Sequence, residues 1–241
     1  MASTPLDIPL ARATGERRLY TWAAVMGLLV VFAGFAPTYY LKSVFGDATE
    51  LGTMRHIHGV VMTAWFTLFL VQARLVATGN THIHRKLGVA GIVLAALVFG
   101  IGIALAIAAV RAGSTPLGIP PLVFLVLPVG EMVAFAALFT TAIVLRKRSD
   151  WHKRLMLLAT LAMLTPAMAR LPFEFIKIGP PVFFALTDLL IIACIVFDTV
   201  KNRRVHPAFI AGLAFIVFVQ VGRLAISGTE AWAAIAKWLV G

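Results

Sequence analysis

Two copies of one short phrase place histidine beside basic residues at the start of long apolar stretches. The phrases are His84-Arg85-Lys86-Leu87 and His152-Lys153-Arg154-Leu155, 68 residues apart. Imidazole exchanges protons near neutral pH and binds metal ions and haem iron. If the two helices that begin with these phrases are neighbours, His84 and His152 can bind one haem iron or metal ion, with Asp150 as a supporting acceptor. The alternative is that both phrases are anchors for anionic lipid headgroups.

A second group of polar residues lies inside apolar stretches, where each charge needs a partner or a cavity. It comprises Glu131, Asp188, Arg170 and Arg223. One interpretation is a structural network of ion pairs. The other is an outer polar cavity in which Arg170 and Arg223 bind an anionic group and Glu131 or Asp188 exchanges a proton.

A stripe of polar groups supports the cavity interpretation. His58, Trp65 and Gln72 recur every seven residues, which puts them on one helix face over a length of about 21 Å. His58 is a candidate metal ligand at the outer end, whereas His56 projects to another face of the same helix. A metal-dependent hydrolase would need three ligands in one layer, and this layer offers one inward histidine.

The composition requires a bilayer as the main solvent. Hydrophobic residues make up 61% of the 241 residues and charged residues 13%, with a mean hydropathy of +0.95, whereas soluble proteins have about 25% charged residues. We therefore expect one all-α integral membrane domain over residues 1–241. Since the lone Cys194 lies in an apolar run, neither an intrachain disulfide nor a cysteine-based metal site is expected.

Seven membrane spans are predicted, because each needs about 20 apolar residues. They cover residues 19–40, 52–77, 85–110, 119–145, 153–171, 181–200 and 207–227. Residues 229–241 carry tryptophan at helical spacing and are predicted to form a short interfacial helix.

The formal charge of +11 is interpreted as a topology signal and not as nucleic-acid binding. Fourteen Lys and Arg fall on the side of the first span's start and four in the links of the other side. The positive-inside rule then predicts a cytoplasmic amino terminus, an external carboxyl terminus and a multi-pass protein of the inner membrane.

The phrases His56-Ile57-His58-Gly59, His84-Arg85-Lys86-Leu87-Gly88 and Trp151-His152-Lys153-Arg154-Leu155-Met156 resemble those of a broad group of uncharacterised bacterial multi-span proteins. They are more distantly similar to the cytochrome b561-like membrane haem proteins. That resemblance implies b haems held by histidines on facing helices and electron transfer across the membrane. Of the residues here, His58, His84 and His152 match as ligands, which allows one bis-histidine haem, at the cytoplasmic side.

Two functional hypotheses follow. The first is a membrane oxidoreductase that binds haem b or a transition metal through His84 and His152 and uses the outer polar residues as a pocket for a quinone or a small apolar or anionic ligand. The second is a cofactor-free transporter or binding protein that works through the outer cavity. Glycines at 88, 91, 100 and 102 allow close helix contact within the protomer or in a homo-oligomer.

Overall fold

The computed structural model describes residues 7–47, 49–115 and 118–241, and side chains from residue 18 on. Within these residues the chain is helical and contains no strand, which confirms the all-α prediction. The elements are α1 (Asp7–Phe35), a π-helical turn η1 (Ala36–Tyr40), α2 (Thr53–Ala77), α3 (Thr81–Arg111), α4 (Pro121–Phe124), α5 (Val126–Val144), α6 (Ser149–Ala162), α7 (Thr165–Met168), a 3₁₀ turn η3 (Glu174–Ile178), α8 (Pro180–Asn202), α9 (Pro207–Ile226) and α10 (Glu230–Val240).

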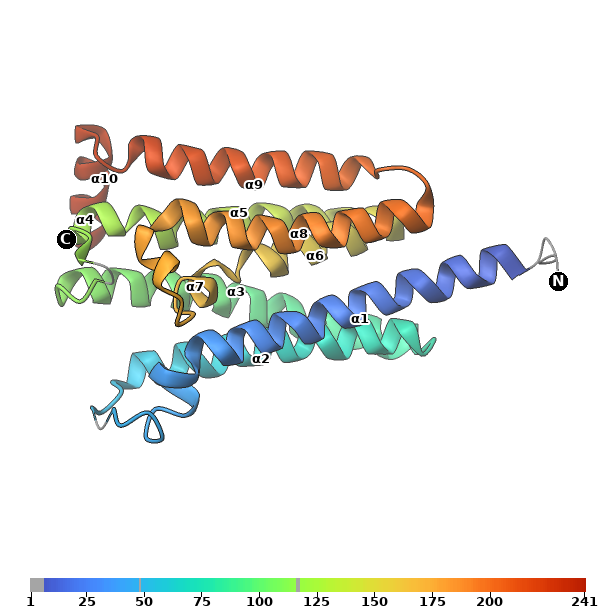
Figure 1. Ribbon diagram of the computed structural model, residues 1–241, viewed down its shortest axis with the longest axis horizontal. Coiled ribbons are helices and arrows are strands. Elements are labelled where there is room, and N and C mark those ends of the chain that lie inside the picture. Colours follow the sequence, from blue (N-terminus) through green and yellow to red (C-terminus); the bar gives the residue numbers. More distant parts are fainter. Residues whose placement is uncertain (1–6, 48, 116–117) are drawn as a thin grey trace.

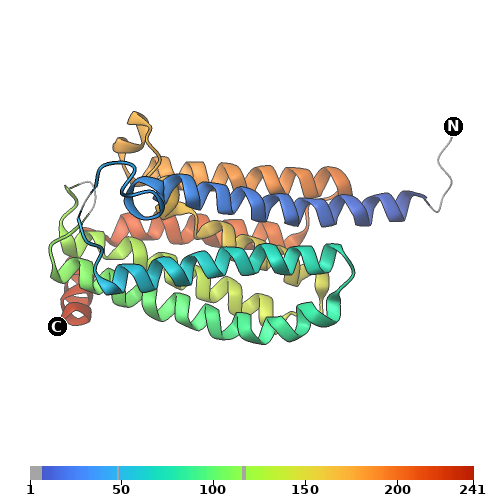
Figure 2. The same ribbon diagram turned by 90° about the horizontal axis from the view of Figure 1, so that it is seen from below.

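The long helices run side by side in one bundle (Figures 1 and 2). In the described residues, six helical stretches are long and apolar enough to cross a membrane: 18–40, 53–77, 81–111, 121–144, 180–202 and 207–226. These coincide with six of the seven predicted spans. The chain is therefore a membrane protein by the length and composition of its helices.

The remaining predicted span, 153–171, is interrupted. Helix α6 ends at Ala162, because Pro166 has no N–H with which to continue the bond to the Ala162 carbonyl. The hydroxyl of Thr165 donates to that carbonyl instead, at 3.0 Å. The short helix α7 then packs against α1 at Gly34, where a Cβ would stand 2.3 Å from the Ala167 carbonyl oxygen. A glycine is needed at this crossing.

The bundle has two distinct ends. One end, called the basic end below, carries the α2–α3, α5–α6 and α8–α9 links at residues 78–80, 145–148 and 203–206 (Figure 1). The other, the α10 end, carries α10 and the carboxyl terminus, with α10 lying across the bundle. The first turns of α1 extend beyond the other helices at the basic end (Figures 1 and 2). The start of α1 and the carboxyl terminus thus lie at opposite ends.

Helix α6 lies at the centre of the core. It packs against α1, α5, α8 and α9, and its residues Leu157, Leu158 and Leu161 are almost fully buried. Burial on nearly every face is expected of a helix surrounded by other helices. Any polar side chain on α6 must therefore find a partner on a neighbouring helix.

The predicted interfacial tail forms α10. Its Trp232 is buried and donates its indole N–H to the Leu122 carbonyl at 2.8 Å, and Arg111 donates its Nε–H to the Val240 carbonyl at 2.7 Å. Trp238 is 79% exposed. Helix α10 therefore packs against the rest of the bundle through Trp232, whereas Trp238 points to the surroundings of the protein.

Candidate functional site

The structure brings His84 and His152 together. His84 lies in the first turn of α3 and His152 in the first turn of α6, and their ring centroids are 6.3 Å apart with an interplanar angle of 76°. Both side chains are partly buried at the basic end of the bundle. We call these two residues the inner histidine pair.

The ring of His152 is oriented by the helix before it. Its Nδ1 is 2.8 Å from the carbonyl oxygen of Ala142 in α5. Since a carbonyl can only accept a hydrogen bond, Nδ1 carries a proton, and in the neutral ring Nε2 then keeps its lone pair. This is the tautomer that binds a metal ion through Nε2, with the backbone carbonyl as the supporting acceptor.

The prediction that Asp150 supports His152 is wrong. Asp150 instead accepts a hydrogen bond of 3.1 Å from Nε2 of His206, and this bond lowers the pKa of the Asp150 carboxyl. His206 also caps α9, since its Nδ1 accepts from the Ala208 N–H. Asp150 and His152 are two positions apart on α6 and therefore project toward different helices.

Gln72 adjoins the inner histidine pair from α2. Its Nε2 donates to the backbone carbonyl of His84 at 3.3 Å. The Oε1 of Gln72 and the Nδ1 of His84 are buried and have no hydrogen-bond partner among the described residues. The stripe that begins at His58 thus reaches the site. Midway along it, Trp65 packs edge-on against Phe135 and Phe139 of α5.

A buried ion pair next to the site was not predicted. Arg154 donates from Nη2 to both carboxylate oxygens of Asp198 in α8, at 2.9 and 2.8 Å, and from Nε at 3.1 Å. Arg154 is 3% and Asp198 0% exposed. The sequence interpretation of Arg154 as a lipid anchor is therefore wrong. The signal available in the sequence was Asp198 itself, an acid inside an apolar run.

Glu131 and Asp188 lie in two separate polar pairs. Arg223 in α9 donates from Nη1 to Glu131 Oε2 in α5, at 2.8 Å, and both residues are buried. Gln220 donates to Asp188 of α8 at 2.9 Å. Oε1 of Glu131 and Nε of Arg223 are buried without a hydrogen-bond partner in the described structure.

No family model, curated protein or solved structure matches this chain. The similarity of the histidine phrases to cytochrome b561-like proteins stays a prediction. In the described part of the chain, no three His, Cys, Asp or Glu side chains gather closely enough to hold a metal ion. The inner histidine pair is thus a pair of histidines and not part of a larger cluster of these residue types in the described structure.

Arg170 and His58 lie apart from these pairs. Arg170 follows α7, donates to the Pro166 carbonyl at 2.8 Å and stacks on the ring of Phe35 at 4.7 Å. Among the described residues it forms no ion pair with Glu131 or Asp188. Nδ1 of His58 is buried without a hydrogen-bond partner among the described residues. The four residues of the predicted cavity therefore make different contacts from one another.

His58 cannot join the inner histidine pair. It precedes Gln72 by 14 residues on α2, a distance of about 21 Å along the helix axis, and Gln72 is the residue that contacts His84. A metal ion at His58 would be a separate site near the α10 end. The inner pair is consequently the better defined of the two candidate ligand sets.

Proposed function

We propose that this protein is a membrane protein of the redox class in which His84 and His152 bind one haem iron or transition-metal ion. The supporting observation is the spacing of the two rings. Imidazole nitrogens bind such metals at about 2.0–2.1 Å, so the centroids of two rings on opposite sides of one ion stand about 6 Å apart. The pair has 6.3 Å. A bound iron or copper would supply one-electron chemistry.

The protein residues would have distinct roles in this site. His152 presents Nε2 because its Nδ1–H is bonded to the Ala142 carbonyl, and His84 contributes the facing ring. Gln72 holds the backbone of His84. The pairs Glu131–Arg223 and Asp188–Gln220 would form the pocket for a quinone or a small anionic ligand.

The topology belongs to the same proposal. The chain crosses the inner membrane seven times, with the interrupted segment α6–α7 as the fifth crossing. The basic end faces the cytoplasm, since its links carry most of the Lys and Arg. The inner histidine pair then lies near the cytoplasmic face and α10 lies at the outer face.

The test is a visible spectrum of the detergent-purified protein, oxidised and then reduced with dithionite, with elemental analysis of the same sample. We expect iron or another transition metal near one per chain, and haem bands if the iron is in a porphyrin. His84→Ala and His152→Ala should lose the metal while still inserting into the membrane. His82→Ala is the matched control, because His82 is an exposed histidine in the same helix turn. A metal-free protein, or full metal content in both site variants, rules the proposal out.

A cofactor-free transporter is the second candidate, supported by the interruption between α6 and α7. Membrane transporters bind substrates where helices are broken. Here the helix breaks between Ala162 and Thr165, and Oε1 of the buried Glu131 has no hydrogen-bond partner among the described residues. If this candidate is right, the purified protein is colourless and metal-free, and a ligand or a lower pH raises its unfolding temperature. Glu131→Gln should abolish that increase. Equal stabilisation of the wild type and Glu131→Gln would contradict it.

A further inference from the structure

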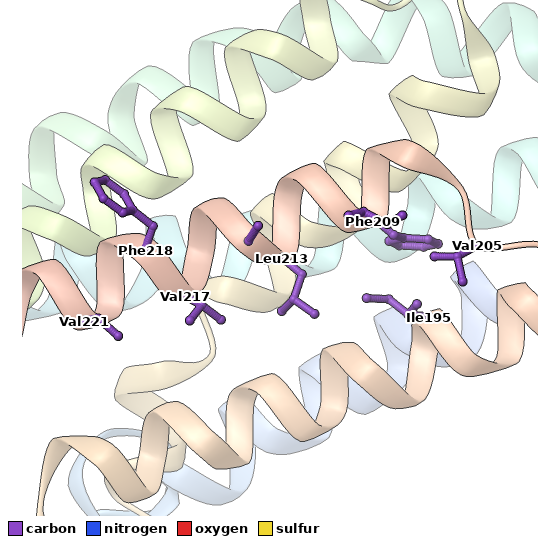
Figure 3. Close-up of a pocket in the computed structure, with 9 residues that line it drawn as sticks. Ile195, Val205, Phe209, Leu213, Val217, Phe218 and Val221 are labelled. Carbon is purple, nitrogen blue, oxygen red and sulfur yellow. The ribbon is translucent and has the colours of Figure 1, made fainter.

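An apolar groove lies between α8 and α9 on the surface of the bundle (Figure 3). It has a volume of about 690 Å³, and none of its nine lining side chains carries a polar atom. Ile195 of α8 lies opposite Phe209 and Val205 at the end next to the α8–α9 link, and Leu213 and Val217 continue the groove along α9 (Figure 3). Because both helices are candidate membrane spans, the groove opens toward lipid chains.

Three cations stand directly before the end of this groove. Lys201, Arg203 and Arg204 are exposed, and the next residue, Val205, lines the groove. Among the described residues, no carboxylate lies within ion-pair distance of them. The acidic residues of this region already have other partners, since Asp198 pairs with Arg154 and Asp150 pairs with His206. The mouth of the groove therefore carries unneutralised positive charge.

The backbone of Arg203 adds an independent observation. It ends α8 in the left-handed conformation, with φ 57° and ψ 21°, and is the one non-glycine residue with positive φ in the described chain. Helices that end in this way usually carry glycine there, because a Cβ is strained in this conformation. An arginine at this position brings a cation to the groove mouth despite that strain.

We infer that the α8–α9 groove binds an anionic phospholipid. One acyl chain lies along Phe209, Leu213 and Val217, and Arg203 and Arg204 bind the phosphate. The groove matches the chain because it is wholly apolar, and the mouth matches the headgroup because guanidinium groups bind phosphate oxygens in pairs. Basic sites between membrane helices at the cytoplasmic side are known binding sites for such lipids. The inference does not depend on a metal at the inner histidine pair.

The bound lipid would stabilise the α8–α9 link. The residue after Val205 is His206, which caps α9 and bonds to Asp150 in the first turn of α6. A phosphate on Arg203 and Arg204 holds this link from outside. The lipid site thus connects to the turn that carries His152.

The experiment measures the unfolding midpoint and lipid retention of the detergent-purified protein with added dioleoyl phosphatidylglycerol or dioleoyl phosphatidylcholine. We expect phosphatidylglycerol to raise the midpoint more and to remain bound in native mass spectrometry. In the double variant Arg203→Gln with Arg204→Gln, the apparent affinity should fall about tenfold or more. Val217→Trp should weaken binding of the chain, and since Val217 is 40% exposed, a larger side chain there leaves the core intact.

Two controls decide the outcome. Lys147→Gln with Arg148→Gln removes the same charge from the α5–α6 link and should keep phosphatidylglycerol binding. Glycerol 3-phosphate carries the same phosphate without acyl chains and should not compete. The proposal is overturned if both lipids act equally, if the control variant loses as much affinity, or if glycerol 3-phosphate competes as well as the lipid.

Discussion

Gly130 determines how close Arg223 comes to α5. A Cβ at this position would stand 2.2 Å from Cδ and 2.5 Å from Cγ of Arg223. The missing side chain lets the guanidinium lie against the helix, where Nη1 bonds to both Glu131 and the Leu127 carbonyl. An ion pair in an apolar core is tolerated only with such close geometry, because removing two charges from water is costly.

Gly130→Ala is predicted to destabilise the protein by about 1–3 kcal/mol, the usual cost of overpacking a core. The added methyl group must displace Arg223 and lengthen its bond to Glu131. Gly222→Ala is the control, since it lies in α9 with no atom within 4 Å of the added Cβ. The measurement is denaturant unfolding in detergent, and equal effects of the two substitutions would contradict this account.

At the scale of elements, α6 is held at its first turn by three neighbours. His152 bonds to α5, Asp150 to the cap of α9 and Arg154 to Asp198 of α8. His152 projects to a different face from Asp150 and Arg154, which are four residues apart and share one face of α6. The turn that positions His152 is thus connected to three other helices.

Asp198→Asn is predicted to cost about 3–5 kcal/mol, because Arg154 keeps its charge in the core and loses the carboxylate of Asp198. The double variant Arg154→Met with Asp198→Leu should recover most of that loss, since both charges are gone. Unfolding free energies of the three proteins check this. A single variant as stable as the wild type would show that the pair is not buried in the folded protein.

At the scale of the whole molecule, charge separates the two ends of the bundle. The links at the basic end hold Arg146, Lys147, Arg148, Arg203 and Arg204, whereas α10 carries Glu230 and Lys237. Cytoplasmic segments of membrane proteins are enriched in Lys and Arg. The charge of the links therefore supports the proposed orientation, with the basic end toward the cytoplasm.

Cysteine labelling in intact cells tests that orientation. In a Cys194→Ala background, Lys237→Cys should react with a membrane-impermeant maleimide from outside, and Lys147→Cys only after the membrane is opened. The reverse pattern would invert the proposed topology. Labelling of both from one side would contradict opposite placement of the two ends.

The sequence by itself determined the features that depend on local pattern. The length of each apolar run predicts a membrane helix, and six of the seven runs are helical stretches long enough to cross a membrane. The start of α9 at His206–Pro207 and the amphipathic α10 were likewise predictable, because caps and helical periodicity involve neighbours in the chain. The interruption of the predicted span 153–171 also has a local cause, the missing N–H of Pro166.

Only the tertiary structure decided which polar groups meet. Arg154 and Asp198 are 44 residues apart, and Glu131 and Arg223 are 92 apart. The residues next to Asp198 in the sequence do not show that it is the acid that binds Arg154. The partner of Arg154 depends on which helix packs against α6 and on how that helix is rotated about its axis. The same reason explains why Asp150 supports His206 and not His152. The repeated phrase suggested that His84 and His152 could be neighbours, and in the structure their rings, in the first turns of α3 and α6, are in contact.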